Sequence, residues 1–181
     1  MPGRLMAALL VVLVAVGCAG PTKLAQRSQS KLATGDRWRA WELATRALDK
    51  APANREARAA AAAAAASIAQ EWQRRIAALA ESDSLAAAEQ VLEFAAFRVD
   101  AAGYTTVAVS PGWARDEHAL RRFAARTNYQ DGVAAMESQR PKRAYLSFMA
   151  VERFVPYYRD AASLADRAYQ HAVAYARERV Q

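Results

Sequence analysis

The chain of 181 residues has little of what catalytic and metal sites are usually built from. It contains one cysteine, two histidines and seven glycines. The His-Glu-x-x-His and paired-cysteine patterns that bind zinc do not occur in it. Glycine loops that cradle phosphate and the Gly-x-Ser-x-Gly turn of serine hydrolases are also missing. We therefore expect no enzyme activity, no bound metal and no cofactor.

The chain also lacks an apolar run long enough to span a bilayer. Its longest such run, residues 5–16, falls short of the roughly 20 residues that a spanning helix needs. This run follows a basic residue, Arg4, and precedes the small residue Gly17. A short basic start, a short apolar segment and small residues at a cleavage site are typical of a secretory signal. With its single cysteine, Cys18, the chain cannot form an internal disulfide.

The end of this segment, Ala15-Val16-Gly17-Cys18, resembles the lipobox of bacterial lipoproteins. The resemblance implies cleavage before Cys18, a diacylglyceryl group on its sulfur and a fatty acid such as palmitate on its amine. We expect residues 1–17 to form a signal peptide and residues 18–22 a lipidated tether, since several acyl chains hold a protein firmly on a membrane. A plain secretory signal with an incidental cysteine is the alternative. Ala19, in place of Asp, favours the periplasmic face of the outer membrane, and the inner membrane remains open.

The chain is basic overall. Lys and Arg number 25 against 18 Asp and Glu, which gives a formal net charge of +7. A basic surface suits anionic lipid headgroups, polyanionic envelope polymers or an acidic partner protein. Nucleic acid is not an expected partner of an exported protein. Because the charges are mixed along the chain, an ordinary solvated surface is the alternative interpretation.

Scarce glycine, abundant alanine and apolar positions spaced by three and four predict an all-α domain over residues 23–181. Asn54 is expected to cap the third helix, and an extended connector is expected at residues 101–111. A break is expected near Thr127-Asn128. The helices are predicted at residues 23–33, 37–51, 55–81, 85–100, 110–139, 141–155 and 157–180.

The spacing within the helices resembles that of tetratricopeptide repeats. Gly35, Ala40 and Pro52 stand at that family's turn, small-residue and proline positions, and Gly132, Ala144, Phe148 and Pro156 match a second copy. Asn128 and Val151 depart from the pattern, and the spacing between copies is uneven. The resemblance implies an irregular solenoid of helical hairpins in which Gly132 and Ala144 face each other at a helix crossing. An ordinary helical bundle with chance spacings is the alternative.

In the tetratricopeptide family the first helix of each pair lines a concave groove that binds a partner. The resemblance therefore implies a lipid-anchored periplasmic scaffold or adaptor that binds another envelope protein. The alternatives are a binder of anionic envelope polymer or lipid and a carrier of a small ligand between helices. The partner's identity and the oligomeric state remain open. The groove positions carried over are Arg126, Tyr129, Val133, Met136 and Glu137 in one helix, and Asp160, Ser163, Arg167, Gln170 and His171 in the last.

Overall fold

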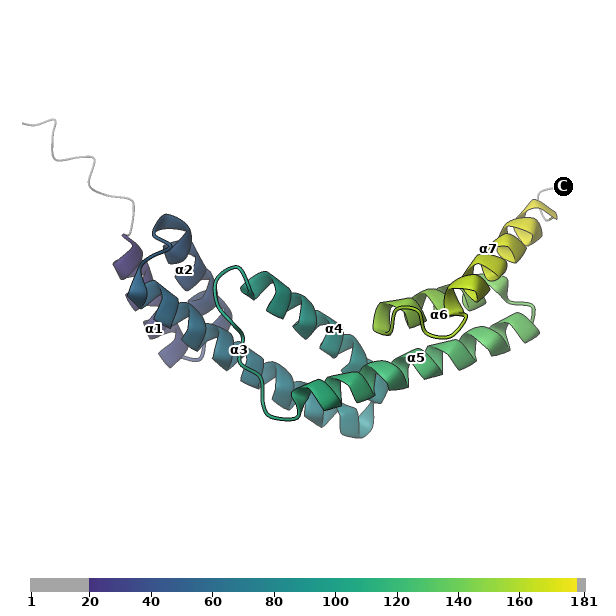
Figure 1. Ribbon diagram of the computed structural model, residues 1–181, viewed down its shortest axis with the longest axis horizontal. Coiled ribbons are helices and arrows are strands. Elements are labelled where there is room, and N and C mark those ends of the chain that lie inside the picture. Colours follow the sequence, from purple (N-terminus) through teal and green to yellow (C-terminus); the bar gives the residue numbers. More distant parts are fainter. Residues whose placement is uncertain (1–19, 179–181) are drawn as a thin grey trace, which may run out of the picture. The chain divides into compact units, whose positions relative to one another are not determined.

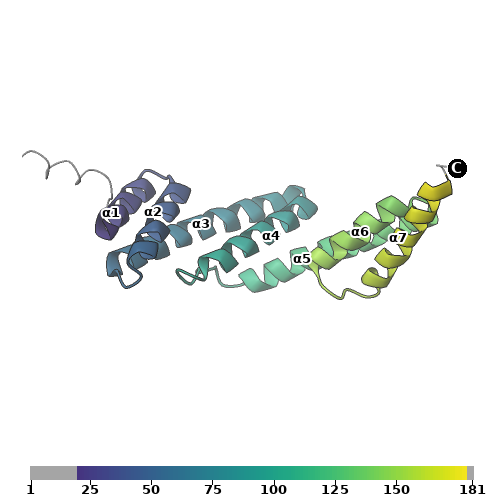
Figure 2. The ribbon, with the colours of Figure 1, turned by 90° about the horizontal axis from the view of Figure 1, so that it is seen from above.

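The computed structural model describes residues 20–178, and every regular element in that range is an α-helix. The all-α prediction is confirmed. The predicted signal peptide and Cys18 lie outside the described residues. No helix between residues 20 and 178 combines the length and apolarity needed to cross a membrane. The helices, shown in Figures 1 and 2, are α1 (Pro21–Ala33), α2 (Arg37–Lys50), α3 (Arg55–Ser82), α4 (Ser84–Ala101), α5 (Trp113–Glu137), α6 (Pro141–Phe154) and α7 (Ala161–Glu178).

The described chain divides into two compact units. The first contains residues 20–68 and 101–107, and the second contains residues 69–100 and 108–178. Helices α1 and α2 pack against each other in the first unit, and α5 packs on α6 and α6 on α7 in the second.

The α1–α2 hairpin turns at Gly35, as predicted. Gly35 has φ +81°, a left-handed conformation that glycine adopts without a steric penalty. Its N–H donates to the Leu32 carbonyl, and the N–H of Asp36 donates to the Lys31 carbonyl. These two bonds form a Schellman motif, which satisfies the last carbonyls of α1. The Asp36 side chain then accepts a hydrogen bond from the Arg39 N–H at 3.3 Å, so the first turn of α2 has its own anionic cap.

The core of the first unit is built largely from small side chains. Buried alanines of α3, among them Ala57, Ala60 and Ala61, pack with leucines and alanines of α1 and α2. The predicted small position Ala40 is fully buried. The buried Ser28 hydroxyl of α1 donates to the Ala40 carbonyl of α2 at 2.7 Å. The two helices therefore approach closely enough for a side chain of one to reach the backbone of the other.

The predicted helix boundaries around α3 are confirmed. The Asn54 side chain accepts from the Ala57 N–H at 2.9 Å and caps the start of α3. Asp83 separates α3 from α4, and its carboxylate accepts from the Leu85 and Ala86 N–H groups. The Trp72 ring of α3 stacks on Phe94 of α4 with centroids 6.1 Å apart.

The connector between α4 and α5 contains no regular structure and is tied down at both ends. In the first unit, the Tyr104 hydroxyl donates to Asp49 Oδ1 at 3.1 Å and its ring meets the edge of Trp41. In the second, the Ser110 N–H and hydroxyl both donate to Gln73 Oε1.

The α5–α6 hairpin repeats the backbone pattern of α1–α2. Gln139 takes the place of Gly35 with φ 53°. Its N–H donates to the Met136 carbonyl, and the N–H of Arg140 donates to the Ala135 carbonyl, as in the first hairpin. Helices α2 and α6 both contain 14 residues. The fully buried Ala40 and Ala144 stand five residues after the respective turn residues.

Gly132 of α5 lies against α6 as the sequence predicts, and its tightest neighbour is an aromatic ring. A Cβ atom at this position would lie 2.6 Å from Cε1 of Phe148. Phe148 is completely buried and meets the ring of Tyr129 edge to face, with centroids 5.8 Å apart. Ala144 lies in the same buried cluster. The crossing of α5 and α6 thus depends on the absence of a side chain at residue 132.

Three predicted helix features are wrong. Pro111 does not start α5, because Gly112 takes a left-handed conformation at φ +89° and the helix begins only at Trp113. No break occurs near Thr127-Asn128, since the Asn128 side chain donates to the Ala124 carbonyl of the same helix. The last helix does not begin at Tyr157, which has φ 60° and lies in a turn before Ala161.

Candidate binding surfaces

The groove positions predicted on α5 differ in their exposure to solvent. Arg126 and Glu137 are exposed to solvent. Tyr129, Val133 and Met136 are half-buried and pack against the core of the second unit. A partner could therefore contact the polar ends of this helix face, while its apolar middle already serves the fold.

Tyr129 joins α5 to the turn before α7. Its hydroxyl donates to Asp160 Oδ1 at 2.7 Å. This hydrogen bond is the main cause that raises the pKa of Tyr129 and lowers the pKa of Asp160. The Arg159 guanidinium lies 5.1 Å from the centre of the Tyr129 ring and 5.4 Å from that of Tyr158. Of the groove positions from the two helices, Tyr129 and Asp160 are in direct contact.

The remaining positions predicted on α7 point to solvent. Ser163, Arg167, Gln170 and His171 are all exposed. They offer hydrogen-bonding and charged groups without a buried pocket beneath them.

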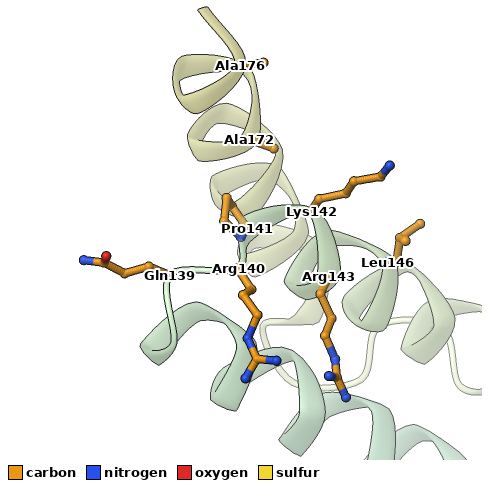
Figure 3. A pocket seen from close by; sticks show the side chains of 8 residues that line it. All are labelled: Gln139, Arg140, Pro141, Lys142, Arg143, Leu146, Ala172 and Ala176. Atoms are coloured by element: carbon orange, nitrogen blue, oxygen red, sulfur yellow. The ribbon is translucent and has the colours of Figure 1, made fainter. Parts of the chain in front are cut away.

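A groove that sequence analysis missed lies between the start of α6 and the end of α7. It has a volume of about 600 Å³. Figure 3 shows Arg140 and Arg143 extending in one direction and Lys142 and Leu146 in another. The lining combines basic, apolar and small side chains: Gln139, Arg140, Pro141, Lys142, Arg143, Leu146, Ala172 and Ala176.

Three cations line this α6–α7 groove without a carboxylate partner among residues 20–178. Arg140, Lys142 and Arg143 are exposed, and none forms an ion pair with a carboxylate in the described part of the chain. They cluster at the first turn of α6, where the helix dipole disfavours positive charge. That turn contains no acidic residue and has no side-chain cap. The equivalent position in the α1–α2 hairpin is Asp36, which caps its own helix.

Helices α6 and α7 also expose large apolar side chains, of which Leu146 lines the groove. Leu146 exposes 58% of its surface, and Met149, one turn further along α6, exposes 43%. On α7, Tyr169 is half exposed and its ring lies 5.6 Å from that of Tyr145. Large apolar side chains that gather in the open beside charged groups mark candidate interaction sites.

A second groove, in the first unit, is also basic but its charges are better balanced. It has a volume of about 510 Å³ and is lined by Arg27, Ser30, Lys31, Thr34, Arg39 and Leu43. Lys31 lies 3.7 Å from Asp36, and Arg39 lies 2.6 Å from Glu42. This α1–α2 groove therefore serves as an internal comparison for the α6–α7 groove.

The best-developed charge cluster centres on Glu117 of α5. Its side chain is only 14% exposed and accepts from Arg98, Arg121 and the Trp113 indole at 2.8–2.9 Å. All three donors hold the carboxylate in place, and no nucleophile lies among them. This cluster ties α4 to the first turns of α5 and has a structural role.

Among residues 20–178, no group of three or more histidine, cysteine or acidic side chains is placed to hold a metal ion. Comparison of the chain with protein-family models, with curated proteins and with solved structures gives no match.

Proposed function

We propose that this protein is a lipid-anchored adaptor without catalytic activity, which binds another protein of the cell envelope. The observation that carries the proposal is the repeated hairpin. Two hairpins about a hundred residues apart in sequence share their turn hydrogen bonds, the length of their second helix and a buried alanine at the same place. Repeated helical hairpins form irregular solenoids, and such proteins act chiefly by binding partners on exposed helix faces.

Membrane attachment is the second part of the proposal, and the lipobox-like residues before Cys18 support it. We place the protein on the periplasmic face of the outer membrane. A Cys18→Ser variant should lose the added mass of the acyl chains and appear in the soluble periplasmic fraction. Membrane association unchanged in that variant, with an unmodified thiol in the parent protein, would refute the anchor while leaving the binding function open.

The binding face is proposed to include Arg126 and Glu137 on α5 and Arg167, Gln170 and His171 on α7. They are exposed residues among the positions that the resemblance to tetratricopeptide repeats implies for the groove. A photo-crosslinking amino acid at Arg126, Gln170 or His171 of the full-length protein in intact cells should yield one envelope protein. The same amino acid at Glu81, an exposed position on α3, is the matched control. Equal or absent crosslinks at all four positions would contradict the proposed face.

Direct binding of an anionic envelope polymer or lipid is the second candidate function. The three cations of the α6–α7 groove, which form no ion pair within residues 20–178, favour it. Such binding should weaken steeply with salt, because exposed charges are screened over about 10 Å at 0.1 M ionic strength. Sedimentation with an anionic polymer at low and high salt tests it, and salt-insensitive sedimentation excludes this candidate.

A further inference from the structure

From the α6–α7 groove we infer a specific class of partner, an acidic amphipathic helix that docks between the start of α6 and the end of α7. The inference rests on the proposed adaptor function and adds the site and the chemistry of the bound segment. It concerns a surface other than the predicted α5–α7 face.

Charge complementarity indicates that the bound segment of the partner is negatively charged. Arg140, Lys142 and Arg143 stand within four consecutive positions and have no carboxylate partner in residues 20–178. In the α1–α2 hairpin, Asp36 supplies an anion at the position equivalent to Arg140. The α5–α6 hairpin keeps the same turn but carries a cation there. A carboxylate of a partner protein would supply the negative charge that Asp36 supplies in the α1–α2 hairpin.

The lining of the groove selects an amphipathic helix. Ala172 and Ala176 are one turn apart on α7, and their small side chains allow another backbone to approach closely. Across from them, Leu146 offers an exposed apolar contact. A groove volume of about 600 Å³ holds several side chains. Partner residues spaced at i, i+3 and i+4 would fill it, with acidic residues flanking them to meet the cations.

The small residues of the lining favour a helix over a bilayer as the occupant. A membrane contacts projecting side chains, whereas Ala172 and Ala176 are small residues of α7 that line the groove. A basic membrane-binding surface needs only charge and exposed rings. The apolar lining with small residues at helical spacing is explained by a helix that enters the groove.

The test uses two synthetic helical peptides with the same leucine stripe, one flanked by glutamates and the other by lysines. Fluorescence anisotropy with the purified full-length protein should detect binding of the glutamate peptide and none of the lysine peptide. Because exposed ion pairs are weak, each of Arg140→Gln, Lys142→Gln and Arg143→Gln should lower affinity about two- to threefold, and the triple variant about tenfold. Leu146→Ser should abolish most of the binding.

Two controls locate the effect. Lys31→Gln with Arg39→Gln removes cations from the α1–α2 groove and should leave the affinity for the glutamate peptide unchanged. Thermal unfolding of Leu146→Ser should match that of the parent, because Leu146 is already 58% exposed. Equal affinity for both peptides, no binding of the glutamate peptide, or binding that Leu146→Ser leaves intact would overturn the inference.

Binding to phosphatidylglycerol vesicles tests whether the groove contacts a membrane instead of a helix. Vesicle binding that the triple variant abolishes, without peptide binding, would assign the groove to a membrane and overturn the helix inference. The adaptor proposal is judged separately by crosslinks from Arg126, Gln170 and His171. Crosslinks to a protein from these three positions, with no peptide binding in the α6–α7 groove, would overturn the inference and support the adaptor function.

Discussion

The contact between Gly132 and Phe148 makes a quantitative prediction. A Gly132→Ala substitution would place a Cβ atom 2.6–2.8 Å from three carbons of the Phe148 ring. Atoms that close must move apart. Phe148 is fully buried and has the Tyr129 ring against it, so it cannot swing into solvent. The strain must then spread into the packing of α5 on α6.

Two opposing contributions decide the sign of the change. Alanine favours a helix interior over glycine by about 1 kcal/mol. Overpacking a well-filled core costs about 1–3 kcal/mol. Because the ring has no free space to move into, we expect the upper part of that range and a net loss of about 1–2 kcal/mol.

Hydrogen exchange measured by mass spectrometry suits this test, because it reports on each unit separately. Exchange of amides in α5 and α6 should become about 5–30 times faster, while α1 and α2 stay unchanged. Ala134→Gly on the exposed side of α5 measures helix propensity alone and should cost about 0.5–1 kcal/mol. In the Gly132→Ala background, Phe148→Leu should cost less than it does in the parent. An alanine variant as stable as the parent would refute the reasoning.

Three further predictions concern buried or bridging polar groups. Ser28→Ala removes the hydroxyl that bonds the Ala40 carbonyl and should cost about 1 kcal/mol, seen as faster exchange in α1 and α2. Glu117→Gln leaves two guanidinium groups without a counter-charge and should cost about 1–3 kcal/mol, measured as faster exchange at the start of α5. A smaller loss would show that solvent replaces the carboxylate. Tyr129→Phe removes the hydrogen bond from the Tyr129 hydroxyl to Asp160. In the folded protein this bond lowers the pKa of Asp160 and raises the pKa of Tyr129. The parent's advantage over this variant should therefore hold at neutral pH. It should fade as pH falls through the lowered pKa of the Asp160 carboxyl and as pH rises through the raised pKa of the Tyr129 hydroxyl. Urea unfolding across pH checks this, and a pH-independent difference would contradict it.

Much of the fold could be predicted because local residues determine the helix ends. Gly35, Asn54 and Asp83 each act within a few residues, through a left-handed turn or a side-chain cap, so their roles are visible in sequence. The predicted extended connector is likewise present between α4 and α5. Features that depend on one short segment are the ones that composition and spacing predict well.

The remaining features depend on contacts or conformations that the sequence does not signal. Gln139 and Tyr157 take left-handed conformations that glycine usually occupies, so the sequence does not identify these two residues as the turn positions, although Pro141 does mark the start of α6. The partner of Gly132 is Phe148, on the next helix. The α6–α7 groove was missed for a related reason, since the cations of Arg140-Pro-Lys-Arg143 become notable only beside the equivalent Asp36. A comparison of the two hairpin turns, position by position, shows the change from Asp36 to Arg140 but not the groove, which also needs Ala172 and Ala176 of α7.

Ala59 to Ala66 in α3 form an unbroken run, and four of these residues, Ala60, Ala61, Ala64 and Ala65, are almost or fully buried. This has an evolutionary consequence. A single base change turns an alanine codon into one for valine, threonine, serine, proline, glycine, aspartate or glutamate. Each of these residues is larger, polar, charged or unfavourable inside a helix. The buried alanines of the run should therefore be substituted far more slowly in evolution than the exposed Ala62 and Ala63, although all carry the same side chain.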